Sequence, residues 1–166
     1  MRVWLDRLVL LAVAAAVGFW AWQKLHPSAE LVIRKRLAEV AAVGSIKSNE
    51  GQLVKLAKAQ KLAGFFTSDV EVTVDVPGRS SQTFTGRDEI QQAVLGARTM
   101  LSSLKIEFLD ILVSVSPDRQ TATAHLTATA TIPGEKLPEI QELEVRLKKT
   151  DHDWLINRVN TVKTLR

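Results

Sequence analysis

The sequence predicts an α+β domain in which a curved antiparallel sheet wraps around three helices, preceded by one transmembrane helix. Three stretches with helical periodicity lie in the first two thirds of the chain, and the residues after 104 alternate with the period of strands. Helices grouped on one side of an antiparallel sheet define the α+β class. The transmembrane helix is predicted from residues 8–22, which are fifteen uncharged residues in a row.

This apolar run makes residues 1–26 a predicted transmembrane signal anchor and residues 27–166 the domain that it carries. Eighteen residues, 8–25, nearly match the ~30 Å hydrocarbon layer when they are helical. Tryptophan side chains suit the two membrane interfaces, and the run has Trp4 before it and Trp20 and Trp22 at its end. A cleaved signal peptide is the alternative. It is disfavoured because Pro27 and the bulky residues before it stand where cleavage requires small residues.

Two signals in the sequence disagree about the orientation of the anchor. Basic residues at 34–36 favour a cytoplasmic domain by the positive-inside rule, whereas a short anchor with a basic start is typical of bacterial proteins whose domain is exported. We expect a single-pass protein of the bacterial inner membrane with an extracytoplasmic domain.

Composition excludes several kinds of function. The chain has no cysteine, which removes disulfides, thiolate metal ligands and cysteine nucleophiles. The net charge of +4 is spread out, without the interleaved aromatic residues of a nucleic-acid surface. No spacing of His, Asp and Glu suggests a metal site, so we expect no metal, no cofactor and no nucleic acid.

Three helices are predicted in the domain. Ser28 is the expected N-cap of the first, which ends near Gly44. Thr85 and Asp88 form the expected cap of the third. The inward residues follow from the helical period: Ile33, Leu37, Val40 and Ala41 in the first helix; Leu53, Leu56, Ala59, Ala63 and Phe66 in or just after the second; and Ile90, Val94, Ala97 and Leu101 in the third.

The strands follow from period-2 alternation. Residues 70–76 form the first strand, Pro77-Gly78 turns the chain, and a short strand returns. The segment 104–116 is long enough to require a bend or bulge near Asp110. Residues 121–132 place threonines and His125 on one face and alanines, Leu126 and Ile132 on the other. Two more strands close the sheet, the first with Leu143, Val145 and Leu147 inward.

The order of these elements resembles that of the nuclear-transport-factor-2-like superfamily, in particular its SnoaL-like branch, over about residues 29–163. The shared motifs are a phenylalanine before an Asp-Val strand, a Pro-Gly turn, a Gly-Arg-x-x-Ile helix start and a Trp-x-Ile last strand. Their positions here are Phe66, Asp69, Val70, Pro77, Gly78, Gly86, Arg87, Ile90, Trp154 and Ile156. The resemblance implies a cone-shaped, cystatin-like fold with a pocket at its open end, and a sheet whose outer face often forms dimers.

Two sets of candidate site residues follow. The small alanine side chains either let the helices approach the sheet or leave an apolar cavity. The pocket-lining candidates are Phe66, Val74, Phe84, Phe108, Ala124, Leu126, Ala128, Trp154 and Ile156. The candidates for interaction through the sheet face are Thr123, His125, Thr127 and Thr129, although plain solvent exposure explains them equally well.

Catalysis has weak candidates. Isomerases of this superfamily pair a carboxylate base with an acid, often tyrosine, and this chain has no tyrosine. Asp75 lies one residue out of step with the position of the base, and His125 shares a face with threonines rather than with the core. We interpret both as solvated side chains and predict no catalytic residue.

The sequence thus favours a membrane-tethered, non-catalytic interaction or assembly domain that associates with itself or with a membrane-complex partner through its sheet face. A binder of a small hydrophobic ligand or lipid in the cone is the alternative, and an isomerase- or cyclase-type enzyme is the second. Lysines 55, 58 and 61, with the basic residues at 34–36, could contact anionic lipid, but a solvated helix face is the simpler interpretation.

Overall fold

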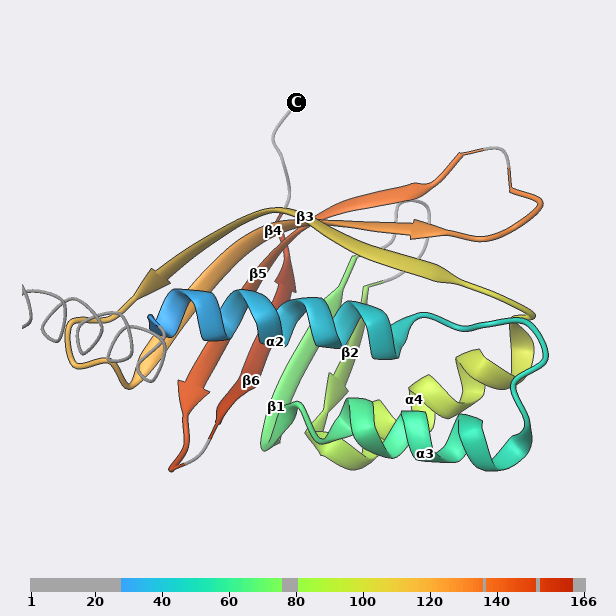
Figure 1. Ribbon diagram of the computed structural model, residues 1–166, viewed down its shortest axis with the longest axis horizontal. Coiled ribbons are helices and arrows are strands. Elements are labelled where there is room, and N and C mark those ends of the chain that lie inside the picture. Colours follow the sequence, from blue (N-terminus) through green and yellow to red (C-terminus); the bar gives the residue numbers. More distant parts are fainter. Residues whose placement is uncertain (1–27, 76–80, 136, 152, 163–166) are drawn as a thin grey trace, which may run out of the picture.

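The computed structural model describes residues 28–75, 81–135, 137–151 and 153–162 (Figure 1). In these ranges, three helices and six strands follow one another in the predicted order. They are α2 (Ala29–Gly44), α3 (Gln52–Ala63), β1 (Phe66–Val74), β2 (Gln82–Thr85), α4 (Gly86–Met100), β3 (Lys105–Val115), β4 (Thr121–Thr131), β5 (Glu139–Lys149) and β6 (Trp154–Thr161). The α+β class is therefore confirmed.

The strands form one sheet in the order β2-β1-β6-β5-β4-β3. All neighbours are antiparallel except β1 and β6, which run parallel. The expectation of a purely antiparallel sheet is therefore wrong at this one junction. The sheet curves, with α2 crossing its concave face and α3 and α4 lying together at the end near β1 and β2 (Figure 1).

Helix α2 was predicted closely. The Ser28 side chain accepts a hydrogen bond from the Leu31 amide at 3.3 Å, so the N-cap is confirmed. The four predicted inward residues of this helix, Ile33, Leu37, Val40 and Ala41, are its buried residues. Ile33 and Leu37 are fully buried against the sheet side of the molecule.

Helix α3 is rotated from the predicted orientation. Ala59 and Ala63 are buried as expected, but Leu53 and Leu56 are 83% and 40% exposed, and Leu62 is buried instead. Phe66 is buried as the first residue of β1. Apolar residues occur on several sides of this helix, so its sequence period alone could not select the buried side.

The cap of α4 also differs from the prediction. Thr85 is the N-cap, but its side chain makes no cap hydrogen bond. Its backbone amide instead donates to the Glu89 carboxylate at 2.6 Å. Ile90 is buried as predicted, and Arg98, which was not predicted, is completely buried.

The predicted bulge in β3 is confirmed. Leu109 pairs with Thr127 and Leu112 with His125, so two residues of β3 lie opposite one residue of β4. Asp110 occupies the bulge with φ 51°, in the left-handed region. The side-chain alternation on β4 and β5 is also as predicted, with Ala122, Ala124, Val145 and Leu147 buried.

Among the residues that the structure describes, no helix is long and apolar enough to span a membrane. The predicted anchor, residues 1–26, lies outside the described residues, as does the Pro77-Gly78 turn.

Candidate functional site

The inner face of the sheet is closed at one end and partly open at the other. Along β4, Ala122, Ala124 and Leu126 are buried, whereas Ala128 and Ala130 are only half-buried. The same change from buried to half-buried occurs at corresponding positions of the neighbouring strands. On β5, Val145 is buried and Leu143 and Gln141 are half-buried. On β6, Val159 is buried and Thr161 is half-buried. On β1, Val70 is buried and Val72 and Val74 are half-buried.

The nine pocket-lining candidates divide between these two ends. Phe66, Ala124, Leu126, Trp154 and Ile156 belong to the closed core, each at most 7% exposed. Val74, Phe84, Phe108 and Ala128 are half-buried, and three of them, Phe84, Phe108 and Ala128, pack against this core. The half-buried group lies at the less buried end of the inner face of the sheet.

Three polar residues meet at the open end. The Asp75 amide donates to Thr161 Oγ1 at 3.1 Å, and Gln141 Nε2 donates to the Asp75 carbonyl at 3.3 Å. The Thr161 hydroxyl also donates to Gln141 Oε1 at 3.5 Å. Neither Gln141 nor Thr161 was singled out from the sequence. The alternation that points Leu143 and Val159 inward could have found them, because each lies two residues further along the same face.

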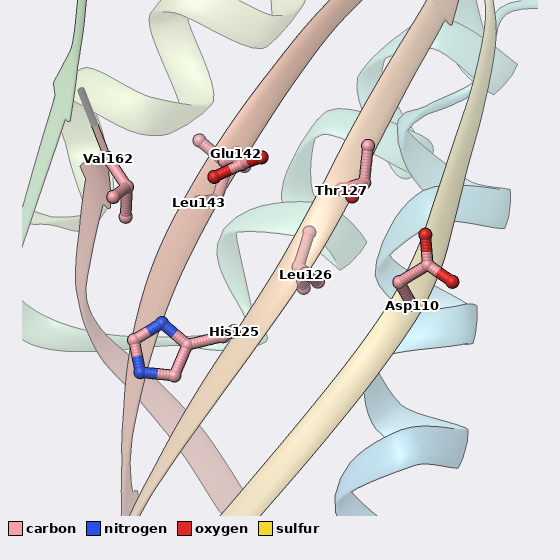
Figure 2. Close-up of a pocket in the computed structure, with 7 residues that line it drawn as sticks. All are labelled: Asp110, His125, Leu126, Thr127, Glu142, Leu143 and Val162. Atoms are coloured by element: carbon pink, nitrogen blue, oxygen red, sulfur yellow. The ribbon is translucent and has the colours of Figure 1, made fainter. Parts of the chain in front are cut away.

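The outer face of the sheet carries the predicted interaction candidates. Thr123, Thr127 and Thr129 are half-buried and His125 is exposed. Two of them, His125 and Thr127, border a hollow of about 140 Å³ beside the β3 bulge. Figure 2 shows that Asp110, His125 and Glu142, which border the hollow, come from three adjacent strands and lie apart from one another.

Exposed apolar side chains lie on the strands around this hollow, and one of them, Val162, borders it. Leu109 is 50% exposed and Leu112 is 68% exposed, one on each side of the bulge. Ile140, on β5, lies opposite Thr129 of β4. Val162 directly follows β6, and its amide donates a hydrogen bond to the Glu142 carbonyl. We call Leu109, Leu112, Ile140 and Val162 the outer apolar patch.

The outer face changes character along β5. Glu142 and Glu144 lie toward the outer apolar patch, and Arg146 and Lys148 lie further away on the same face. A second hollow of about 310 Å³ is bordered by Thr121, Thr123, Arg146, Lys148 and other residues at this basic end. Glu144 and Arg146 also form an ion pair at 2.9 Å within the chain.

The two residues considered for catalysis lie in different places. His125 is exposed on the outer face, away from the cone interior. Asp75 is half-buried just after β1, and its backbone is held by the open-end polar residues. A catalytic hypothesis therefore depends on Asp75 alone. Within the described ranges, no group of three or more His, Cys, Asp or Glu side chains could hold a metal ion.

An ionic cluster joins the α2–α3 loop to α4. Arg98 Nη1 donates to Glu50 Oε2 at 2.6 Å, and Arg98 Nη2 donates to the carbonyls of Val43 and, at 3.2 Å, Ser45. Lys58 forms a second ion pair with Glu50. This network was missed because a charged residue in a helix is normally exposed, and the partner lies 48 residues away in the sequence.

Glu50 is held ionised by its surroundings. Burial raises the pKa of its carboxyl. The hydrogen bonds from Lys58 and from the Lys47 amide, together with the positive charges of Arg98 and Lys58, outweigh burial and bring the pKa below its ordinary value of 4.5. The cluster thus links the α2–α3 loop, α3 and α4 through ion pairs.

A curved six-stranded sheet around three helices, with its inner face open at one end, defines a cystatin-like α+β cone. The family described as the SnoaL-like domain matches residues 35–160, and the chain belongs to this family. The superfamily resemblance expected from the sequence is confirmed to that extent. The family comprises ligand-binding and isomerase-type proteins.

Solved structures share the fold at low sequence identity. An NTF2-like protein with a cystatin-like fold from Novosphingobium aromaticivorans is 16% identical with a TM-score of 0.59, over 92% of this chain and 88% of that one. A putative scytalone dehydratase from the same organism is 17% identical (TM-score 0.55; 80% and 83% covered). A putative aromatic ring hydroxylase from it is 14% identical (TM-score 0.62; 82% and 90% covered). Among curated proteins, none matches the chain.

Proposed function

We propose that this protein is a membrane-tethered, non-catalytic assembly domain that associates with itself through the outer face of its sheet. The observation that carries the proposal is the outer apolar patch, in which four large apolar side chains are between 38% and 68% exposed on one sheet face. Groups of exposed apolar residues on a folded domain mark interaction sites more often than scattered single ones.

The surroundings of the patch favour a flat contact. Thr127 and Thr129 lie opposite Leu109 and Ile140, so uncharged side chains connect members of the patch across β4. Charged residues are depleted from the centre of protein interfaces and form their rims. In this patch Glu144 lies toward the rim, opposite His125, whereas Glu142 lies between Thr127 and Val162, so one carboxylate of β5 stands inside the patch.

The charges along β5 favour a second copy as the partner. A two-fold interface must be complementary to itself, because the same surface is used by both copies. When two outer faces meet with their β5 strands antiparallel, Glu142 and Glu144 of one copy approach Arg146 and Lys148 of the other. This strand surface is therefore suited to pairing with its own copy.

Sedimentation of the full chain in detergent solution tests the proposal, with Leu112→Lys as the disruptive variant and Leu53→Lys as its matched control. Both leucines are exposed, so neither change removes a core contact. Burying one leucine is worth about 1.5–3 kcal/mol, and a two-fold interface contains it twice. Leu112→Lys should weaken the dimer on the order of a hundredfold or more, and Leu53→Lys should not. A wild-type chain that stays monomeric would contradict the proposal.

The tether is proposed from the sequence of residues 1–26. A retained anchor should keep the protein in the membrane pellet after alkaline carbonate extraction, whereas a cleaved leader should release a shortened chain. For the exported orientation that we propose, protease added to intact spheroplasts should digest the domain. Protection of the domain would place it in the cytoplasm instead.

A second candidate function is the binding of a small apolar ligand, such as a lipid, in the open end of the cone. The half-buried apolar residues there, together with Gln141 and Thr161, supply the apolar wall and few polar groups that ligand pockets combine. Native mass spectrometry should detect a bound ligand that Ala128→Trp displaces. Thr129→Trp is the matched control on the outer face. Equal ligand occupancy in both variants would exclude this site.

A further inference from the structure

Helix α3 presents its apolar side chains to solvent. Leu53, Val54 and Leu56 are 83%, 46% and 40% exposed, within one and a half turns of each other. Near the end of the adjacent helix α4, Met100 is 86% exposed. A helix that packs on a domain normally turns such residues inward. Their outward position on α3 marks a candidate site for a partner that accepts apolar side chains.

The positive charge of the chain is concentrated around the same helices. Residues 29–63 contain seven basic and three acidic side chains, a net charge of +4, which equals the net charge of the whole chain. Residues 64–166 contain twelve basic and fourteen acidic side chains. Arg34, Lys35 and Lys61 are exposed on α2 and α3. Residues 29–63, which contain α2 and α3, thus carry a net charge of +4, whereas residues 64–166 carry −2 and residues 1–28 carry +2.

The sequence before α2 supplies the connection to a membrane. The fifteen uncharged residues 8–22 end six residues before Ser28, the N-cap of α2. Leu31, in the first turn of α2, is 60% exposed. Helix α2 spans about 24 Å and packs against α3, whose first turn lies near the far end of α2 (Figure 1). A bilayer that holds residues 8–22 therefore reaches Leu53 when both helices lie along its surface.

We propose that the outward side of α2 and α3 docks on the surface of an anionic lipid bilayer. We call this surface the helical docking face; its apolar and basic members are Leu31, Arg34, Lys35, Leu53, Val54, Leu56 and Lys61, and the exposed Glu39 follows Lys35 by one helical turn. Its leucines and valine enter the headgroup boundary, and its cations contact lipid phosphates. This inference takes the tether from the proposed function and adds the orientation of the domain. The sheet then faces away from the membrane, where a second copy can reach it.

The composition of the face favours lipid over a protein partner. Protein interfaces are enriched in aromatic residues and arginine at their centres and depleted in lysine. The α3 part of the face contains no aromatic residue and no arginine, and its exposed cation is Lys61; Arg34 of α2 is the arginine of the face. Leucine beside lysine on one helix is the combination found in helices that lie in the membrane interface.

The absence of cysteine allows single-cysteine reporters in the full chain. Leu53→Cys on α3 and Leu112→Cys on the outer sheet face each receive a polarity-sensitive fluorophore. The labelled proteins are reconstituted into vesicles of phosphatidylcholine, with or without an equal part of phosphatidylglycerol. The probe at residue 53 should shift to the blue and be quenched by a lipid-attached nitroxide only in the anionic vesicles. The probe at residue 112 should not be quenched.

Charge reversal provides the second arm. The helical variant is Arg34→Glu, Lys35→Glu and Lys61→Glu, and the matched variant on the sheet side is Lys105→Glu, Arg119→Glu and Lys149→Glu. Each basic residue near an anionic surface changes the equilibrium constant for docking about fivefold, so removing three lowers this constant on the order of a hundredfold. The helical variant should lose quenching at residue 53, as should the wild type in high salt, and the sheet variant should keep it.

Two results would overturn the docking. One is a probe at residue 53 that is equally unquenched in both kinds of vesicle. The other is a blue shift without lipid that grows with protein concentration, which would assign the face to a second copy or another protein. Failure of the tether has a different readout, because the chain would then leave the vesicles in alkaline carbonate. Failure of sheet association would appear only in sedimentation, where the wild type would be monomeric and Leu112→Lys would not differ from it.

Discussion

Arg98 shows how one buried charge can hold a loop. Its guanidinium pairs with Glu50 and binds the Val43 and Ser45 carbonyls, which otherwise have no helical partner at the end of α2. Its Nε is buried without a hydrogen-bond partner among the described residues. The cluster thus joins the α2–α3 loop to α4 at the cost of one unsatisfied donor.

Removing this guanidinium should destabilise the fold. Arg98→Ala leaves Glu50 buried beside Lys58 alone and leaves two carbonyls without their donor, so we expect a loss of about 3–5 kcal/mol in the free energy of unfolding. Urea unfolding followed by circular dichroism measures it. Arg119→Ala, an exposed turn residue, is the control and should change stability by less than about 0.5 kcal/mol. Equal effects of the two changes would contradict the role of Arg98.

Glu50 should make the free energy of unfolding depend on pH in the acid range. Its pKa is lower in the folded protein than its ordinary value of 4.5, so the unfolded chain binds more protons in this range. The stabilisation is complete above pH 4.5 and is lost as the pH falls through the folded-state pKa. Urea unfolding at several pH values should show this loss in the wild type. Glu50→Gln should be less stable at neutral pH and flatter below it, and an unchanged slope would refute the prediction.

At the scale of elements, α3 and the β3 bulge depart most from regular patterns. Rotation of α3 buries Leu62 and exposes Leu53. The bulge places Asp110 at φ 51° and separates the two exposed leucines of the outer apolar patch. Each feature makes a surface that a regular element would not make.

The rotation of α3 predicts unequal effects of two similar truncations. Leu62→Ala removes buried methyl groups and should cost about 2–5 kcal/mol. Leu53→Ala removes a side chain that is 83% exposed and should cost no more than about 0.5 kcal/mol. Thermal unfolding of both variants measures the difference. The reverse order would mean that the predicted inward position of Leu53 is the correct one.

The left-handed residue of the bulge predicts a preference for glycine. Asp110→Gly relieves a conformation that side chains rarely adopt and should be close to neutral in stability. Asp110→Val places a β-branched side chain at the same angle and should cost roughly 1–3 kcal/mol. Chemical unfolding distinguishes them. Equal stability of the two variants would argue against a fixed bulge at this position.

At the scale of the whole molecule, the cone has one firm end and one open end. The core residues of four strands are buried near Trp154 and half-buried near Gln141 and Thr161. Sites of ligand entry are drawn from parts of a fold that open readily. This asymmetry is what the second candidate function requires.

Hydrogen exchange should reveal the asymmetry. Amides of residues 121–126 in β4 should exchange at least about tenfold more slowly than those of residues 127–131, because local opening of the half-buried end exposes fewer apolar contacts. Mass spectrometry of peptides from the full chain resolves the two halves. Equal protection along β4 would show that the two ends are equally firm.

Much of the fold could be predicted from local patterns. Serine before an apolar stripe predicted the start and the buried face of α2, and strict alternation predicted which faces of β4 and β5 are buried. The bulge near Asp110 followed from the length of its strand. These features depend on neighbouring residues, so the sequence by itself determined them. The anchor in residues 1–26 and the lining of the cone pocket remain predictions.

The tertiary structure decided the features that depend on distant contacts. The parallel pairing of β1 with β6 joins strands far apart in the chain. The rotation of α3 depends on its packing against α4, and the burial of Arg98 depends on Glu50. A helix with apolar residues on several sides can bury any of them, and a charge is buried only where its partners meet it. The outward leucines of α3, and with them the helical docking face, follow from those long-range contacts.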